Sequence, residues 1–245
     1  MSKGFEASSK ATATLDERYG KPAQFTPSGD GAIAPARIEV FLAVRDATAP
    51  ARAAIAGIFS KFPTREEAEA LDKKPFFEKL LTGMGIARVG MSLPTAIADF
   101  FKLRDEAMLA NDMGMGEYSY IYTLAFQSWL GHSPDDGPLS EKHQGSAMQP
   151  GVQGRIQGEL VAMLENQAAS LPPDAPQAWR DGLAAEIAAM KEDRSRILWK
   201  DGLPETIARS LEPYRERLET SYVPSTHPFE LARNRKTGSL SYTAD

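Results

Sequence analysis

The sequence predicts a mainly α-helical protein, and two observations carry this prediction. Residues 116–131 contain one charged side chain, Glu117, and place apolar or aromatic side chains around the whole circumference of a helix, which is typical of a buried central helix. Apolar side chains also recur at helical spacing over most of the chain between Pro35 and residue 222. We therefore expect a multi-helix, bundle-like domain with an irregular N-terminal arm and a small C-terminal β-hairpin.

The expected arm covers residues 1–34. This stretch is polar, contains Pro22, Pro27 and the run Ser-Gly-Asp-Gly at 28–31, and keeps neither a helical nor a strand period. A segment of this composition buries too little apolar surface to fold by itself. We expect a flexible N-terminal arm that ends where the helical pattern begins.

The helical pattern begins at Pro35, a residue that suits the first turn because a helix start leaves its backbone donors unpaired. Pro50 is expected to kink or divide this first helix. A short charged helix is predicted from Thr64, another helix follows Pro75, and a further one follows Pro94 and runs to about Asp112. Each predicted helix carries an apolar side that can join a common core.

Residues 132–150 form an internal loop that is long for a compact domain. Beyond it, three amphipathic helices are predicted at roughly 151–171, 176–199 and 204–222, and Pro213 is expected to kink the last of them. We expect one helical domain over 35–222 with this loop inside it. Two domains that divide at 132–150 are the alternative.

A C-terminal tail is expected over 223–245. Apolar residues flank the basic turn-like run at 233–238, which predicts a small hairpin. A loose C-terminal arm is an equally weighted alternative. The flanking apolar residues are Phe229, Leu231, Leu240 and Tyr242.

The composition narrows the classes of function. The 245 residues carry a formal net charge of -5, which argues against a polyanion such as nucleic acid as the main partner. Cysteine is absent, so disulfides, thiolate nucleophiles and cysteine-bound metals are excluded. We expect no transmembrane segment, because the apolar stretch near 118–134 is shorter than the roughly 20 residues that a bilayer requires. The first ten residues lack the apolar core of a signal peptide, and the compartment stays open.

Cofactor and metal motifs are weak in this chain. The glycines at 83, 85 and 90 do not complete a dinucleotide-binding loop, because position 88 is arginine and no strand pattern precedes them. The three histidines have no metal-ligand spacing, although His132 lies near Asp135 and Asp136. A Gly-x-Ser-x-Gly nucleophile motif is also missing. We expect neither a cofactor nor a metal.

A short repeated pattern suggests a buried polar cluster. The sequence Phe-x-x-x-Arg-Asp occurs at 41–46 and again at 100–105. One interpretation is that Arg45 and Arg104 approach each other or Glu117, as buried guanidiniums approach carboxylates. The alternative, which we favour on general grounds, is that both form ion pairs at the edge of an apolar face with their charged ends in water.

The central helix offers candidates for a ligand pocket. Tyr118, Tyr122 and Trp129 share one region of the helix surface and lie beside the hydroxyl of Thr123. Aromatic groups with polar ends next to small hydroxyls can line a binding pocket. The alternative, which we favour, is that these side chains belong to the core and that their polar atoms find partners there.

Three functions are consistent with these patterns. We expect a non-catalytic helical protein that acts through contacts with an unknown protein partner. This expectation includes an association with the cell envelope. The first alternative is a carrier of a small apolar ligand in the pocket just described. The second is an enzyme that uses dispersed acid–base groups, for which the candidates are Asp46, Asp105, Glu117 and His132.

Overall fold

The computed structural model describes residues 3–61, 76–134, 136 and 148–233. In this part of the chain the secondary structure is helical and contains no strand, so the predicted mainly α fold is confirmed. The longer helices are α1 (Lys3–Tyr19), α2 (Pro35–Phe59), α4 (Phe76–Ala110), α5 (Met115–Tyr122), α7 (Met148–Ala169) and α8 (Gln177–Glu192). The shorter ones are α9 (Glu205–Leu211), α10 (Arg215–Ser221) and α11 (His227–Glu230).

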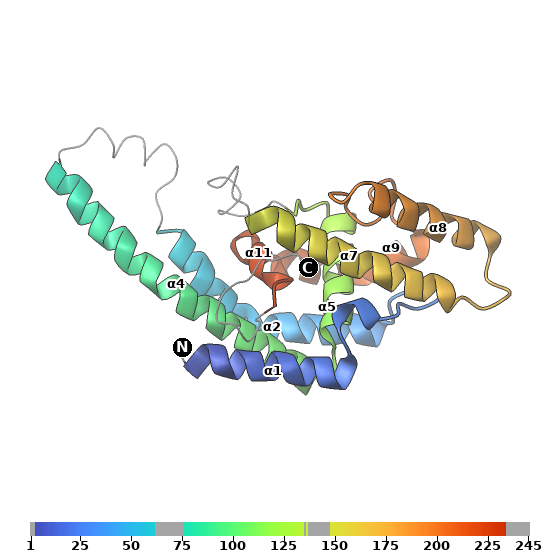
Figure 1. Ribbon diagram of the computed structural model, residues 1–245, viewed down its shortest axis with the longest axis horizontal. Coiled ribbons are helices and arrows are strands. Elements are labelled where there is room, and N and C mark those ends of the chain that lie inside the picture. The colour runs from blue at the N-terminus through green and yellow to red at the C-terminus, as the bar shows by residue number, and fades with distance from the viewer. Residues whose placement is uncertain (1–2, 62–75, 135, 137–147, 234–245) are drawn as a thin grey trace.

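The predicted central helix is α5, which continues into a π-helical stretch at Thr123–Trp129. It crosses α2 and α7 steeply, so the arrangement differs from a bundle of aligned helices (Figure 1). The glycines before and within its first turn permit close packing. A Cβ atom at Gly116 would lie 2.6 Å from both the Pro22 carbonyl oxygen and the Phe25 Cβ atom. Only glycine lets the chain at 22–25 lie against this helix.

Two groups of buried apolar side chains hold the helices together. The larger group surrounds α5 and joins α2, α7, α8 and the following short helices, with Phe41, Tyr118, Tyr122, Phe126 and Leu164 fully buried. The smaller group, which we name the arm-base cluster, lies between α2 and α4. It consists of Ala51, Ile55, Ile97, Phe100, Phe101, Phe229 and Ala232.

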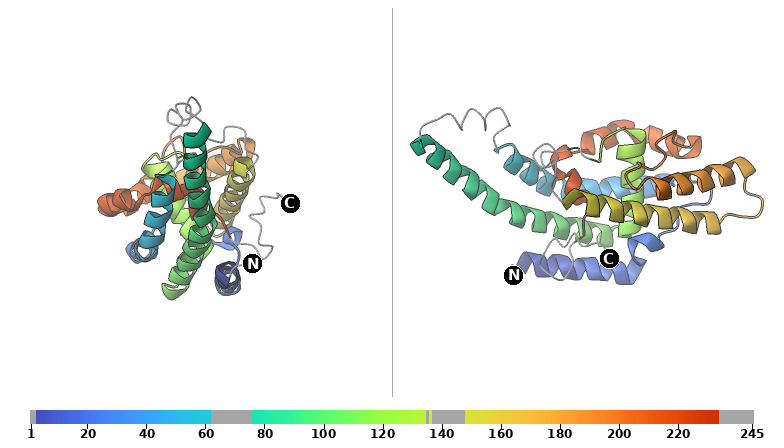
Figure 2. Two further views of the ribbon diagram at one scale, coloured as in Figure 1. Left: turned by 90° about the vertical axis from the view of Figure 1, so that its left-hand side faces the viewer. Right: turned by 45° about the horizontal axis from the view of Figure 1, so that its top comes forward.

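Helices α2 and α4 extend from the body as an arm. Both pack side by side, and the first half of α4 reaches beyond the end of α2 (Figures 1 and 2). The arm-base cluster lies where this pair meets the C-terminal segment at Phe229 and Ala232.

The expectation of an irregular N-terminal arm over residues 1–34, a segment separate from the arm of α2 and α4, is wrong for its first part. Residues 3–19 form helix α1, which packs along α4. Ala11 and Leu15 are buried one turn apart, and the Thr12 hydroxyl donates a 2.5 Å hydrogen bond to Asp105. The apolar side of α1 is narrow, so packing on α4 rather than a strong sequence period stabilises this helix.

Two prolines lie inside continuous helices. Helix α2 continues through Pro50, and α4 continues through Pro94, although the sequence predicts a new helix after Pro94. Both prolines are exposed, and a helix can continue through a proline although one helical hydrogen bond is lost there. At Pro213 the expected interruption is present, because the 3₁₀ helix Glu212–Tyr214 separates α9 from α10.

The expected C-terminal hairpin falls largely on residues 234–245, outside the described residues. The part that is described differs from a strand, since Phe229 belongs to helix α11 and Leu231 to the turn after it. Of the expected loop at 132–150, residues 132–134 and 136 are described, and α7 already begins at Met148.

Candidate functional site: a buried arginine cluster

The carboxylate of Glu230 is the centre of a fully buried polar site. Arg45 Nη1 lies 3.2 Å from Glu230 Oε1, and both side chains are completely buried. The Tyr118 hydroxyl donates to Oε2 at 2.7 Å, and the Thr226 hydroxyl donates to Oε1 at 3.3 Å. Both carboxylate oxygens are therefore satisfied without water.

The charges of this site stabilise one another. Burial by itself would raise the pKa of Glu230, but Arg45 and Arg52 more than offset that effect and hold the pKa below its usual value. Burial opposes the charge of Arg45, yet Glu230 raises the pKa of Arg45 above its usual value. Burial also raises the pKa of Tyr118, so its phenol remains a donor. Glu230 and Arg45 thus form an ionised pair at neutral pH.

Arg45 and Arg52 also bind the last residue of helix α10. Arg45 Nε donates to the Ser221 hydroxyl at 3.0 Å, and Arg45 Nη2 and Arg52 Nη1 both donate to the Ser221 carbonyl oxygen. A helix C-terminus carries partial negative charge on such carbonyls, so two guanidiniums are favourable there. Burial and the neighbouring Arg45 lower the pKa of Arg52.

Arg104 fixes the backbone of the C-terminal segment. Its Nε and Nη2 atoms donate to Asp105 Oδ1 at 3.0 and 2.8 Å. Its Nη1 atom donates to three carbonyl oxygens, those of Phe229, Glu230 and Ala232, at 3.2, 2.8 and 2.9 Å. Arg104 therefore satisfies the carbonyls that the end of α11 leaves without helical partners. Together we name Arg45, Arg52 and Arg104 the arginine cluster.

His227 lies at the edge of the site that faces residues 132–134 and 136. The Tyr122 hydroxyl and His227 Nδ1 are 2.8 Å apart, and the two rings stack. Burial lowers the pKa of His227, while Glu230 and Asp136 act in the opposite direction. Burial also raises the pKa of Tyr122 strongly. A neutral His227 that accepts a hydrogen bond from the phenol fits both shifts.

Nearer the surface, His132 stacks on Tyr222 with ring centroids 3.7 Å apart. The Tyr222 hydroxyl donates to Asp136 Oδ2 at 3.0 Å, and His132 Nδ1 lies 3.5 Å from the same oxygen. These contacts hold residues 132 and 136 against Tyr222, the residue that follows α10. Burial and the bond to Asp136 raise the pKa of Tyr222.

The structure separates the three candidates for a buried polar cluster. Arg45 and Arg104 are both buried and both contact the segment at 229–232, through different atoms of Glu230. Glu117 lies elsewhere and forms a two-pronged ion pair with Arg37 at 2.6 and 2.5 Å. The dispersed acid–base candidates do not converge either: Asp46 is exposed, Asp105 pairs with Arg104, and His132 is near the surface.

The four carrier candidates occupy different environments. Tyr118, Tyr122 and Thr123 are buried, with the two phenols bonded to Glu230 and His227. Trp129 lies nearer the surface, where the Arg215 guanidinium is 4.1 Å from the indole centroid.

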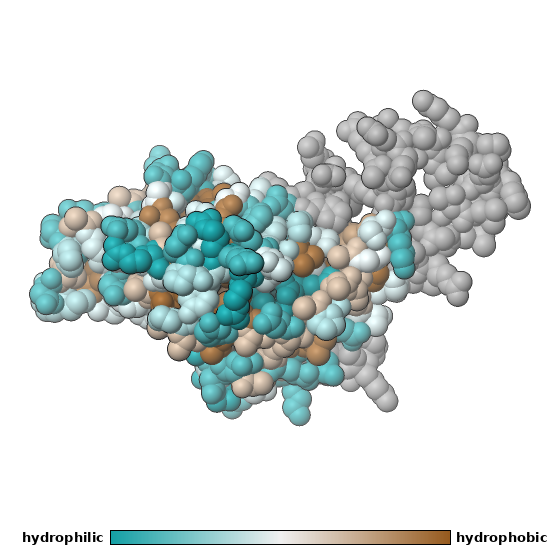
Figure 3. Space-filling view, turned by 180° about the vertical axis from the view of Figure 1, so that it is seen from behind, coloured by the Kyte–Doolittle hydropathy of each residue, from teal (hydrophilic) through white to brown (hydrophobic). Residues whose placement is uncertain are grey.

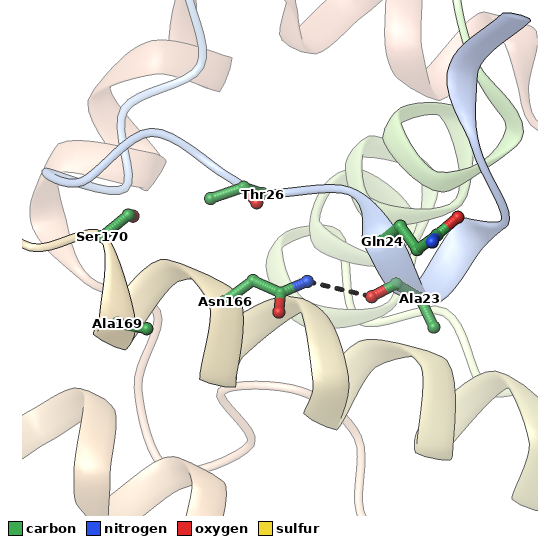
Figure 4. A pocket seen from close by; sticks show the side chains of 6 residues that line it. All are labelled: Ala23, Gln24, Thr26, Asn166, Ala169 and Ser170. Carbon is green, nitrogen blue, oxygen red and sulfur yellow. Dashed lines mark hydrogen bonds between the residues drawn. The ribbon is translucent and has the colours of Figure 1, made fainter.

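A shallow pocket of about 410 Å³ lies elsewhere, between η1 (Pro22–Gln24) and α7. Its lining is Ala23, Gln24, Thr26, Asn166, Ala169 and Ser170, which includes none of the four carrier candidates (Figure 4). Asn166 Nδ2 donates to the Ala23 carbonyl oxygen at 3.0 Å, so this amide holds η1 on α7.

Comparison of the chain with models of protein families, with curated proteins and with solved structures finds no match. A proposal about its role therefore rests on the geometry alone. No helix in the described part of the chain combines the length and the apolar character needed to cross a membrane. Over the same residues, no group of three or more His, Asp or Glu side chains is placed to hold a metal ion.

The C-terminal half of the site is not apparent from the sequence. No helical or strand period marks Glu230, His227 and Ser221, and their contacts are long-range. One local signal was available: Glu230 stands directly between Phe229 and Leu231. A carboxylate flanked by apolar residues becomes buried only when a cation accompanies it.

Proposed function

We propose that this protein acts non-catalytically through protein–protein contacts, and that the exposed face of α2 in the arm is the contacting surface. The observation that carries the proposal is the charge distribution along α2. Over residues 47–60 the single charged side chain is Arg52, and Arg52 is buried in the arginine cluster. The exposed residues of this stretch include Ala49, Ala53 and Gly57, which are spaced four apart.

An uncharged helical face of small residues suits contact with another helix. Residues four apart lie on the same side of a helix, and small side chains let a second backbone approach closely. The centres of protein interfaces are likewise depleted of charge. A Cβ atom at Gly57 would have no neighbour within 4 Å, so this face is open within the described structure.

The surroundings support the same proposal. On the face drawn in Figure 3, hydrophilic residues predominate over the middle of the body. The arm-base cluster and the arginine cluster hold α2 in place beneath this face, which keeps it preformed for binding.

The test places one charge on the proposed surface. Ala53→Glu adds a carboxylate to the exposed face of α2, and Ala185→Glu adds one to the exposed side of α8 as a matched control. Tagged protein of each kind is used for quantitative affinity capture from its native cells and for sedimentation equilibrium. We expect a saturable partner or a second copy of the chain, with binding reduced about tenfold by Ala53→Glu and retained by Ala185→Glu.

Two results contradict the proposal. One is equal binding by Ala53→Glu and Ala185→Glu, which would place the contact elsewhere. The other is the absence of any saturable partner and of self-association for the unmodified protein.

A further inference from the structure

The C-terminal segment, residues 222–232, lies in the body like a bound peptide. Its helices are the three-residue turn Pro224–Thr226 and the four-residue α11. Helices this short do not form by themselves, because the free energy needed to nucleate a helix exceeds what the hydrogen bonds of one or two turns contribute. The conformation of the segment therefore depends on the groove that holds it, which is formed by α2, α4 and α5.

Two adjacent side chains anchor the segment. Phe229 enters the arm-base cluster and stacks on Phe59 with ring centroids 6.5 Å apart. Glu230 enters the arginine cluster and pairs with Arg45. An aromatic residue followed directly by a carboxylate thus occupies an apolar site and a cationic site at once, as anchor residues do in peptide recognition.

The groove also binds the backbone of the segment. Arg104 donates to the carbonyl oxygens of Phe229, Glu230 and Ala232, and these bonds do not depend on the identity of the side chains there. In peptide recognition by strand addition, main-chain bonds supply affinity and side-chain sites supply specificity, and the contacts of this segment combine the same two kinds of interaction.

The three arginines of the groove carry more positive charge than the carboxylates paired with them neutralise. Arg45 pairs with Glu230 and Arg104 pairs with Asp105. Arg52 is 2 % exposed and forms no direct ion pair among the described residues, although its charge acts on Glu230 from a distance. Its Nε atom is buried without a hydrogen-bond partner. Because the groove is cationic and the Arg52 Nε donor is unpaired, the groove favours an acidic ligand.

From these contacts we infer that the groove is a peptide-binding site, which the chain's own residues 222–232 occupy and which an acidic segment of a partner protein enters by displacing them. The recognised feature is an aromatic residue followed directly by Glu or Asp. This site lies beneath the arm and is separate from the exposed face of α2, so the charge test on Ala53 does not bear on it.

The experiment uses the full chain and a fluorescent peptide with the sequence of residues 222–233, followed by fluorescence anisotropy. Glu230→Gln in the full chain weakens the internal occupant, keeps every residue of the groove in place, and leaves Arg45 without its carboxylate partner. We expect this variant to bind the peptide about tenfold more tightly than the unmodified chain. A peptide that carries Glu230→Gln or Phe229→Ala should bind the variant chain about tenfold more weakly.

The inference is overturned if the peptide shows no saturable binding to either chain, or if the altered peptides bind as well as the original. Hydrogen exchange of the unmodified full chain gives a second test that needs no variant. We expect the amides of 222–232 to exchange by local opening, faster than those of α5. Exchange of this segment only through global unfolding would show that it cannot be displaced, and would also overturn the inference.

Discussion

Arg45 and Glu230 form an ion pair at 3.2 Å with both side chains completely buried. Arg45 lies in the first half of α2, and Glu230 ends the last short helix of the described chain. The pair therefore fixes the C-terminal segment to the base of the arm. Its stabilising effect depends on both partners being present, because either charge alone would be buried without compensation.

Breaking this pair should destabilise the fold strongly. We expect Arg45→Met to lower the free energy of unfolding by about 3–5 kcal/mol, because Glu230 is then buried without its cation. The measurement is urea unfolding followed by circular dichroism. Arg217→Gln is the control, since the Arg217–Glu39 pair is half exposed and should contribute about 1 kcal/mol or less.

The double variant Arg45→Met, Glu230→Met separates the loss of the ion pair from the cost of leaving one charge buried without a partner. Replacing both charges with apolar side chains removes the uncompensated carboxylate, so the double variant should be more stable than Arg45→Met alone. A double variant whose loss equals the sum of the two single losses would contradict the direct coupling of the pair.

Acid should loosen the C-terminal segment in two steps. The pKa of His227 in the folded protein lies below its usual value near 6.5, so the unfolded chain takes up the proton first and stability falls as the pH drops below 6.5. The pKa of Glu230 is lowered from about 4.5, so its contribution is present above that pH and is lost as the pH falls through its folded value.

The measurement is the free energy of unfolding as a function of pH. In His227→Gln the decline that begins near pH 6.5 should become smaller, and the decline below about 4.5 should remain. His132→Gln is the control, because this ring lies nearer the surface. If His227→Gln and the unmodified protein have the same profile between pH 4.5 and 6.5, His227 is not the group that titrates there.

The sequence determines the local elements of this fold more clearly than their partners. The uncharged composition of 116–131 predicts the central helix, and Pro35 marks the first residue of α2. Helix α1 was missed, because its buried side offers little beyond Ala11 and Leu15 and its stability comes from packing on α4. Contacts between distant segments decided that part of the fold.

The same distinction applies to the site. The repeated Phe-x-x-x-Arg-Asp pattern draws attention to Arg45 and Arg104, and the structure buries both. Their common contact with Glu230 could not be foreseen, because the tail lacks a helical period that would place it against α2 and α4. Glu117 carries a charge in the first turn of α5 and pairs with Arg37, a residue that no local pattern marks.

Two neighbouring tyrosines allow a matched test of the hydrogen bond to Glu230. Tyr118→Phe removes a 2.7 Å bond to a buried carboxylate and should cost about 1.5–3 kcal/mol of stability. The Tyr120 hydroxyl is also buried but has no hydrogen-bond partner in the described structure, so Tyr120→Phe should change stability by about 0.5 kcal/mol or less, or increase it. Equal losses in the two variants would contradict the assigned role of the Tyr118 hydroxyl.

The close approach at Gly116 predicts a strongly position-dependent effect of adding one methyl group. In Gly116→Ala the new Cβ atom would meet the Pro22 carbonyl oxygen and the Phe25 Cβ atom at 2.6 Å, so backbone must shift and about 1–3 kcal/mol of stability should be lost. Gly182→Ala is the matched control, because Gly182 is exposed in α8 with open space around its Cβ position. There the higher helix propensity of alanine should increase stability by up to about 1 kcal/mol. Thermal unfolding should therefore show opposite shifts for the two substitutions, and a stabilising Gly116→Ala would contradict the packing of 22–25 against α5.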